Sequence, residues 1–553
     1  MSVAPRPGPA RAQAWLPWGR AVLTGALLVA VMTAPTLSRL TTVGRLDTND
    51  GRYSIWNIAW IGHAILTDPA RLIDANIFWP HTGTLAYSEL NLVGGLLGLP
   101  WYAATGSPLA ALNGAVATAL LLAFVCMWAL VRRLTASEAA GLVSATAFTF
   151  CPYVSARTPH VQLLMIFAFP LVLTAFHRLA DRASVGRGAA LGAALGLAAL
   201  ACGYYGIFAG LAVAWFSIVF ARRARTYWLA LAAAGASAAV LVTPVYWVFA
   251  RARAASGATL LDRADQSREW SANLSSYLAS GTAAHAWWLP VLRAWDPWVD
   301  VLFPGVLLIL LAGMGLAQFR SRPHQPQAIL AYAGLAVLSA WASFGPDAGL
   351  YRLLGATIPG MDLLRAPARL GIVVTFALAV LAGYAVAHLE RTRRWLPILL
   401  VLLVAAEAGV KTEQWGWPSW PLRTTPALSP VYTRLADLPR APLVEFPFPY
   451  VSSNFHNHAQ AMYWSTYHWQ PLVNGYSDVI PPDFADIALP INGFPDEPSF
   501  AIMRERGVRY VVWHTDFYDA PSIAIIEQRL ARYPGALRPI LKTANAWLYE
   551  IVR

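Results

Sequence analysis

Long apolar stretches fill most of the first 410 residues, and no other feature of the sequence constrains the fold as strongly. A helix of about 20 apolar residues crosses the hydrocarbon core of a bilayer. About eleven stretches meet or approach this length: 18–37, 107–131, 139–156, 162–180, 188–205, 206–221, 227–249, 300–318, 327–344, 369–389 and 395–410. The apolar block 188–221 is too long for one span, and Gly203-Tyr204-Tyr205-Gly206 predicts the turn that divides it. We therefore expect 20–410 to form an all-α polytopic transmembrane bundle.

The composition changes after residue 410. Hydrophobic residues make up 57% of the 553-residue chain and charged residues only 13%, whereas a soluble protein carries about a quarter charged residues. Residues 411–553 instead read like an ordinary globular domain, with strand-like and helical periodicities. The predicted strands are 442–448, 508–514, 537–543 and 546–552, and the predicted helix is 521–533. We expect a small soluble α/β domain there.

Basic clusters between the apolar stretches predict the orientation in the membrane. They lie at 132–133, 177–187, 222–225, 320–324 and 390–394. All of them share one side with the N-terminus if the ambiguous segment 86–104 does not cross, and positive loops stay in the cytoplasm. We therefore predict that 86–104 is an interfacial or re-entrant helix on the outer face. The protein is then expected in the bacterial cytoplasmic membrane.

This topology assigns the remaining segments. A disordered cytoplasmic segment, 1–19, precedes the first span, and the loops 38–106, 250–299 and 345–368 face outward together with the domain 411–553. The formal net charge of +12 resides in short clusters rather than on a basic face, so nucleic-acid binding is not expected. Cys126, Cys151 and Cys202 all lie in apolar stretches, which leaves 411–553 without a disulfide or a cysteine-based metal site.

The first outer loop contains two acids three residues apart, Asp47 and Asp50. A predicted amphipathic helix, 53–66, follows them and carries Trp56 and Trp60 at interface depth. Carboxylates held beside a membrane surface accept a proton from an incoming hydroxyl or bind a divalent cation such as Mg²⁺ or Mn²⁺. The alternative interpretation is that these acids only cap the helix, since two acids at this spacing form a weak pattern.

An acidic outer loop after the first span, then an interfacial helix and many spans, resembles the GT-C superfamily of membrane glycosyltransferases. The resemblance covers the layout of the first 220 residues and is specific around Asp47 to Trp60. It implies a polyprenyl-phosphate-linked sugar donor and places the catalytic base or metal ligand at Asp50, with Asp47 second. The family frequently has adjacent Asp and Glu residues in this loop, whereas here Gly51 follows Asp50.

The chain also resembles a group of large bacterial polytopic membrane proteins along almost its full length. The resembling stretches are Asn76 to His81, Thr84 to Glu89, Leu302 to Gly305, Leu364 to Arg369, Tyr463 to Thr466 and Asn474 to Ser477. This likeness supports the fold more than any substrate, because a fold does not determine a function.

Further polar residues are candidates for substrate binding. Arg365, Arg369 and His160 are the candidate ligands of the donor phosphate, because arginine matches phosphate geometry with two parallel donors; headgroup anchoring is the alternative for both arginines. His81, Glu89, Tyr463 and Trp464 are the candidate acceptor-binding residues. For the aromatic residues near 456–469, a sugar-binding surface and an ordinary domain core are both compatible with the sequence.

Taken together, these patterns favour a GT-C-type glycosyltransferase. It would move a sugar from a polyprenyl-phosphate donor to a glycan, lipid or protein acceptor on the outer face of the cytoplasmic membrane. The alternatives are a transporter or flippase of a lipid-linked glycan and a non-catalytic protein of envelope assembly. Transporters tend to carry ionisable residues within their spans. Here the spans are nearly free of them, with Glu407 as an exception.

Overall fold

A computed structural model describes residues 9–255, 263–296, 300–318, 326–358, 360–361, 364–409, 423–425 and 428–552. The chain divides into two compact units. The first, called the helical unit here, comprises Met1–Arg39, Val116–Thr243 and Leu261–Pro421. The second, called the sheet unit, comprises Leu40–Ala115, Pro244–Leu260 and Leu422–Arg553. Each unit therefore contains segments that lie far apart in the sequence.

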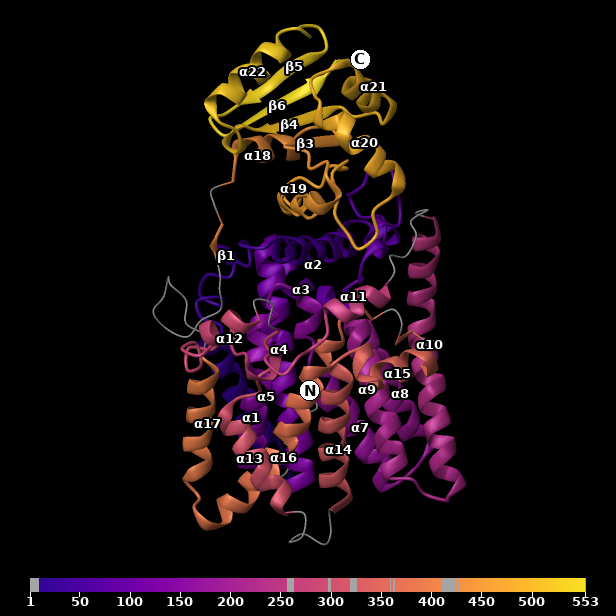
Figure 1. Ribbon diagram of the computed structural model, residues 1–553, viewed down its shortest axis with the longest axis vertical. Helices are drawn as coiled ribbons and strands as arrows, with labels where there is room; N and C mark the ends of the chain where they lie inside the picture. Colours follow the sequence, from indigo (N-terminus) through magenta and orange to yellow (C-terminus); the bar gives the residue numbers. More distant parts are fainter. Residues whose placement is uncertain are drawn as a thin grey trace, which may run out of the picture. The chain divides into compact units, whose positions relative to one another are not determined.

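Helices form the helical unit almost entirely (Figure 1). They are α1 (Pro9–Met32), α4 (Pro108–Thr135), α5 (Glu138–Thr149), α6 (Pro152–Ala156), α7 (Ala168–Asp181), α8 (Val185–Ala201), α9 (Gly203–Val219), α10 (Arg225–Ala255), α11 (Arg263–Glu269), α12 (Leu289–Trp295), α13 (Val306–Ala317), α14 (Pro326–Ser343), α15 (Leu350–Thr357), α16 (Gly371–Thr392) and α17 (Leu396–Ala408). The first residues of α4 and the last of α10 belong to the sheet unit. Each expected span overlaps at least one of these helices.

Among the described residues, six helical segments are long and apolar enough to cross a membrane. They are Trp15–Met32, Pro108–Thr135, Glu138–Ala156, Arg225–Ala255, Pro326–Ser343 and Pro367–Thr392. Shorter apolar helices are Leu92–Thr105, Val185–Ala201, Gly203–Val219, Val306–Ala317 and Leu396–Ala408. The chain is thus a multi-pass membrane protein, while the number of crossings and their orientation stay predictions.

Two expected boundaries differ from the structure. Helix α1 begins at Pro9, so the expected disordered segment 1–19 is wrong for residues 9–19, and residues 1–8 lie outside the described part of the chain. Proline fits the first turn of a helix and the alanines that follow favour helix, which explains the earlier start. The division of 188–221 falls at Cys202, and Gly203 already begins α9.

Small residues allow close helix packing in the helical unit. Helix α16 is the most buried of the candidate spans and packs against α5, α13 and α14. A Cβ atom on Gly188 or Gly192 of α8 would lie 2.0 or 2.2 Å from a backbone oxygen of α10. Glycines four residues apart thus bring these backbones together, as is typical of helix pairs in membranes.

The sheet unit contains the C-terminal sheet and much of the first loop (Figure 1). Its elements are β1 (Val43–Gly44), α2 (Asn49–Thr67), α3 (Leu92–Thr105), β2 (Arg423–Thr424), α18 (Pro430–Ala436), β3 (Leu443–Phe446), α19 (Ala459–Ser465), α20 (Pro482–Asn492), α21 (Glu497–Glu505), β4 (Tyr510–His514), α22 (Ala520–Leu530), β5 (Leu537–Lys542) and β6 (Ala546–Ile551). The larger sheet has the order β3-β4-β6-β5, with β3 parallel to β4 and the other pairs antiparallel. All four predicted strands and the predicted helix are present.

Residues 76–79 of the first loop are hydrogen-bonded to the C-terminal sheet region. Leu472 N donates to Asn76 O at 2.8 Å, Trp79 N to Leu472 O at 3.0 Å and Phe78 N to Asn474 O at 3.2 Å. The segment 471–474 in turn lies beside β3, where Leu443 N donates to Pro471 O at 2.8 Å. The loop and the C-terminal domain, which the sequence presents as separate, therefore fold together.

The side chain of Asn76 adds to this connection. It is 5% exposed. Its Oδ1 accepts a hydrogen bond from Trp56 Nε1 of α2 at 3.0 Å. Its Nδ2 donates to Ser465 Oγ of α19 and to Gln470 O, both at 3.1 Å. One buried amide thus joins α2, α19 and the segment that precedes Pro471.

We predict that Asn76→Ala destabilises the sheet unit by about 2–4 kcal/mol, because it removes three hydrogen bonds and leaves the buried Trp56 N–H without its acceptor. The measurement is the rate of limited proteolysis within 428–552 in detergent. Asn545→Ala, which truncates an exposed asparagine of the same unit, is the matched control. Equal proteolysis rates in the two variants would contradict the connecting role of Asn76.

Candidate functional site

The two candidate acids lie at the start of α2. This helix begins at Asn49, four residues before the predicted start, and its N-cap is Thr48, whose hydroxyl accepts from Gly51 N at 3.1 Å. Asp50 is therefore exposed in the first helical turn rather than in a loop, and it is not the capping residue. The helix dipole favours a carboxylate at this position.

Asp47 has a different environment from Asp50. Arg45 binds both of its carboxylate oxygens, with Nε 3.0 Å from Oδ1 and Nη2 3.2 Å from Oδ2. Arg52 adds a second attractive charge. Burial lowers the pKa of the Arg45 guanidinium, and the neighbouring Asp47 opposes this shift. A carboxylate that already engages a guanidinium with both oxygens is less available as a base or metal ligand.

Gly51 explains a departure from the GT-C pattern. A Cβ atom at this position would lie 1.9 Å from the backbone oxygen of Arg45. The loop that holds Arg45 against Asp47 thus passes directly over the first turn of α2. A glutamate after Asp50, as the family frequently has, does not fit this loop.

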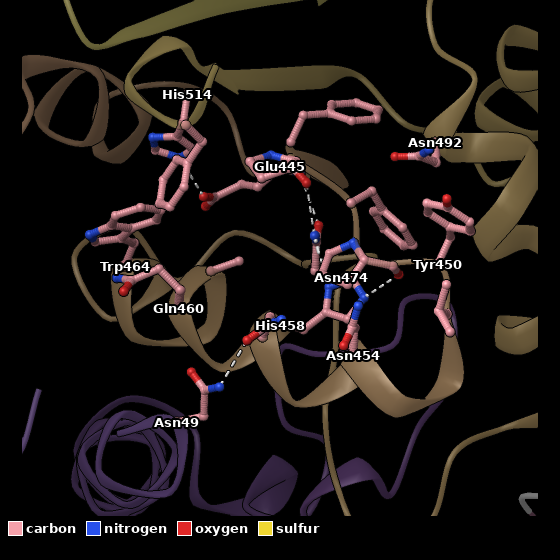
Figure 2. Close-up of a pocket in the computed structure, with 18 of the residues that line it drawn as sticks. Asn49, Glu445, Tyr450, Asn454, His458, Gln460, Trp464, Asn474, Asn492 and His514 are labelled. Atoms are coloured by element: carbon pink, nitrogen blue, oxygen red, sulfur yellow. Dashed lines mark hydrogen bonds and ion pairs between the residues drawn. The ribbon is translucent and has the colours of Figure 1, made fainter. Parts of the chain in front are cut away.

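A pocket of about 520 Å³ lies within the sheet unit (Figure 2). It is lined by Asn49, Arg52, Glu445, Phe446, Pro447, Phe448, Pro449, Tyr450, Val451, Asn454, Asn457, His458, Gln460, Ala461, Trp464, Asn474, Asn492, His514 and Phe517. Asn49 and Arg52 come from the first turn of α2, on either side of Asp50 in the sequence. Asn49 Nδ2 donates to Asn457 Oδ1 at 2.9 Å, which joins α2 to the pocket wall. We call this cavity the Trp464 pocket.

A buried carboxylate forms part of the wall. Glu445 is 1% exposed, and its Oε2 accepts from Tyr432 Oη at 2.9 Å and from His514 Nε2 at 3.0 Å. Burial favours the neutral acid, but the neighbouring imidazoles of His468 and His514 outweigh it and hold the pKa of Glu445 below its ordinary value. Its Oε1 lies 3.9 Å from His468 Nε2 and makes no hydrogen bond with the described residues.

The four candidate acceptor-binding residues do not come together. Trp464 lines the pocket that bears its name. Tyr463 is 2% exposed, and its hydroxyl is 3.0 Å from those of Thr425 and Tyr467. His81 Nε2 lies 2.8 Å from Asp483 Oδ1 and lines a different cavity of about 340 Å³. Glu89 is half-buried and lines neither cavity.

Sequence reasoning missed the amides of the Trp464 pocket, although their spacing offers a signal. Asn454, Asn457 and Gln460 recur every third residue, and the 3-10 helix Ser452–His458 holds the first two. A 3-10 helix has three residues per turn, so residues three apart share a face. The interior histidines His458 and His468 are core residues, as the alternative interpretation of this region allowed.

The candidate phosphate ligands belong to the helical unit. The backbone N–H of Arg365 donates to Tyr204 Oη at 3.0 Å, and the Arg369 guanidinium lies 4.3 Å from the centre of the Tyr204 ring. The guanidinium of Arg369 and the backbone of Arg365 thus lie at one tyrosine of α9. Both arginines are half-buried.

Arg157 and His160 extend this arginine cluster. Tyr153 interacts electrostatically with both Arg157 and Arg369, which places the hairpin 152–160 beside the segment 364–370. Arg157 is paired with Asp300, and His160 N donates to Arg157 O at 3.0 Å. Sequence reasoning named His160 but gave Arg157 no role, because the tertiary contact with Tyr153 is not visible in the sequence.

A metal site is not apparent from the described side chains, among which no group of three His, Cys, Asp or Glu residues is arranged to hold an ion. The role of Asp47 and Asp50 as metal ligands therefore remains a prediction. Two carboxylates supply fewer ligands than a protein site for a hard cation usually has, so substrate phosphate and water would have to complete the shell.

No protein-family model and no curated protein matches the sequence. Solved structures do match. The arabinofuranosyltransferase AftD from mycobacteria gives a TM-score of 0.55 at 15% identity over 97% of this chain and 40% of AftD. The oligosaccharyltransferase AglB from Archaeoglobus fulgidus, in complex with an inhibitory peptide and a dolichol-phosphate, gives a TM-score of 0.51 at 12% identity. This match covers 96% of this chain and 74% of AglB. ArnT from Cupriavidus metallidurans gives a TM-score of 0.41 at 15% identity, and the match covers 99% of both chains.

The chain therefore shares its fold with AftD and AglB, in agreement with the fold that the resemblance implied. It spans 40% of the length of AftD, and at these identities the likeness concerns the fold.

The close approach at Gly51 gives a stability prediction. Gly51→Ala is expected to destabilise the sheet unit by about 1–3 kcal/mol, because the new methyl group collides with backbone rather than with a movable side chain. Thermal unfolding in detergent, followed by tryptophan fluorescence, measures the effect. Gly535→Ala is the control, since a Cβ there has no atom within 4 Å. A Gly51→Ala protein as stable as this control would show that the loop adapts.

Proposed function

We propose that the protein is a glycosyltransferase that uses a polyprenyl-phosphate-linked sugar as donor. Asp50 takes the proton from the acceptor hydroxyl, whose oxygen forms the new glycosidic bond while the bond from the sugar to the phosphate oxygen breaks. The products are the glycosylated acceptor and polyprenyl phosphate. In this proposal the reaction takes place on the outer face of the cytoplasmic membrane.

The position of Asp50 is the observation that carries the proposal. It is an exposed carboxylate in the first turn of α2, and its neighbours Asn49 and Arg52 line the Trp464 pocket. Neighbouring residues of a helix point in different directions, so Asp50 lies on the turn beside the pocket without lining it. A general base has to reach the hydroxyl proton of a bound acceptor, and in this proposal the acceptor hydroxyl extends from the pocket to Asp50.

The arginine cluster supports a phosphate-bearing donor. The guanidinium of Arg369 lies over Tyr204, which also binds the backbone of Arg365. Arg157, which is paired with Asp300, and His160 lie nearby. Departure of a phosphate leaving group requires positive charge near its oxygens. Of the matching structures, AglB is solved with a dolichol-phosphate, which is consistent with a lipid-linked donor here.

A divalent cation fits the same proposal without being required by it. Asp50, with Asp47 beside it, would hold the ion, and the ion would supply positive charge for the donor phosphate. The guanidinium of Arg45 would have to release one oxygen of Asp47 for both acids to bind.

The environment of Glu407 argues against the transporter alternative. Its carboxylate accepts from the backbone N–H of Val306 and, at 3.1 Å, from that of Leu307 at the start of α13, and it is 3.1 Å from His285 Nε2. A carboxylate bound to the orphan N–H groups of a helix start stabilises that helix. This ionisable residue of an expected span thus has a structural role.

We predict that Asp50→Asn lowers the rate of sugar transfer by about 10²–10⁴-fold, the range of general-base contributions. The assay mixes purified protein with polyprenyl-phosphate sugars extracted from bacterial membranes and follows release of free polyprenyl phosphate by mass spectrometry. Asp486→Asn, which alters an exposed acid of α20, is the matched control. Release by Asp50→Asn at the wild-type rate would remove Asp50 as the base.

Arg369→Gln is expected to lower kcat/KM for the lipid-linked donor by about ten- to a hundredfold, because a hydrogen bond to a charged group contributes about 1.5–3 kcal/mol. Binding of undecaprenyl phosphate alone, measured with purified protein in nanodiscs, should weaken by a similar factor. Arg352→Gln, an exposed arginine of α15, provides the comparison. Undiminished phosphate binding by Arg369→Gln would leave headgroup anchoring as its role.

A further inference from the structure

We propose that the Trp464 pocket is the acceptor site of this reaction and that it binds the uncharged end of a carbohydrate chain. The assignment as an acceptor site rests on the proposed function. Carbohydrate binding is argued from the pocket itself. Its volume of about 520 Å³ falls in the range of small-ligand sites, about 300–1,000 Å³, and is enough for a sugar residue with part of its neighbour.

Carboxamides distinguish this pocket from an ordinary apolar cleft. Asn454, Gln460 and Asn492 extend from different sides of the cavity (Figure 2). Their side-chain amides make no hydrogen bond with the described residues, and all three are exposed or half-buried. An amide offers two donors and one acceptor oxygen, which matches hydroxyl groups that donate and accept at once. Several such groups around one cavity suit a polyhydroxylated ligand.

The buried carboxylate contributes charge to the wall rather than an open acceptor. Glu445 Oε2 accepts from Tyr432 and from His514. Its Oε1 is enclosed by protein and lies 3.9 Å from Nε2 of His468, which does not line the cavity. The hydrogen bonds to a sugar are therefore expected from the carboxamides.

The charge of the pocket gives an anionic ligand no advantage. Burial lowers the pKa of His458 to about 3, so its ring is neutral at physiological pH, and its Nε2 and Nδ1 already engage Pro449 O and Asn474. Arg52 supplies the one guanidinium among the lining residues and already donates to Asn49. Glu445 adds one negative charge to the wall, which offsets the charge of Arg52. A neutral ligand therefore suits this pocket better than a phosphate or carboxylate does.

Aromatic rings supply apolar faces for a sugar ring. Trp464 is half-buried and stacks on His514 with ring centres 4.1 Å apart, which fixes its orientation. Phe517 and Tyr450 also line the cavity and are 55% and 46% exposed, far more than the aromatic residues of the core. Exposed aromatic rings beside hydrogen-bonding groups are typical of binding sites rather than of domain interiors.

The test is direct binding to the full-length protein in nanodiscs, measured by titration calorimetry. The probes are four neutral oligosaccharides, built from arabinofuranose, mannose, galactose and glucose, and one trigalacturonate as the anionic comparison. At least one neutral probe should bind. Asn454→Ala and Gln460→Ala should each weaken its Kd by about three- to tenfold, the loss of one or two hydrogen bonds. Trp464→Ala should weaken it further.

Gln528→Ala, an exposed glutamine of α22 outside the pocket, should bind like the wild type. Asp50→Asn should also bind normally, because Asp50 does not line the pocket. Wild-type protein that binds a neutral probe but releases no polyprenyl phosphate in the transfer assay would refute the proposed function and leave the pocket assignment intact. Three results would overturn the pocket assignment: no neutral probe binds at millimolar concentration, both amide variants bind like Gln528→Ala, or trigalacturonate binds at least as tightly as the neutral probes.

Discussion

Backbone hydrogen bonds between residues 76–79 and 471–474 are the interaction on which the rest of the sheet unit depends. They extend the sheet region beside β3 by a segment that lies almost 400 residues earlier in the chain. Asn76 strengthens this pairing with three side-chain hydrogen bonds in a buried position. Because α2 is fixed through the same contacts, the first turn that carries Asp50 has a defined position relative to the pocket-lining residues of the C-terminal domain.

Charge is distributed differently in the two units. The helical unit holds the guanidinium of Arg369 over Tyr204 and that of Arg157 over Tyr153, and in the proposed function these groups attract the donor phosphate. The Trp464 pocket offers amides, aromatic rings and one buried carboxylate, an environment suited to neutral hydroxyl groups. In the proposed reaction the two substrates differ in the same way, since the donor carries a charged phosphate and the acceptor supplies a neutral hydroxyl. Each unit would then bind one of them.

Local patterns predicted the elements of this fold well. The length of the apolar stretches predicted the helices, and the alternation of apolar and polar residues predicted β3 to β6. Both signals depend only on residues that are neighbours in the sequence. The pocket was not predictable in the same way. Trp464 and Tyr463 are adjacent aromatic residues, yet one lines a cavity and the other lies in the core, and only tertiary packing decides between them. Likewise, the role of Gly51 depends on a backbone oxygen that the sequence does not place beside it.

The discontinuous composition of the sheet unit has a consequence for recombination between related proteins. Residues 40–115, 244–260 and 422–553 belong to one compact unit, although some 300 residues separate the first segment from the last. A chimaera that exchanges only the C-terminal domain would pair a foreign sheet edge with the resident segment 76–79 and a foreign Asn457 with the resident Asn49. A chimaera that keeps these contacts intact has to take all segments of the sheet unit from one parent, so the segments should be transferred, and should diverge, as a linked set.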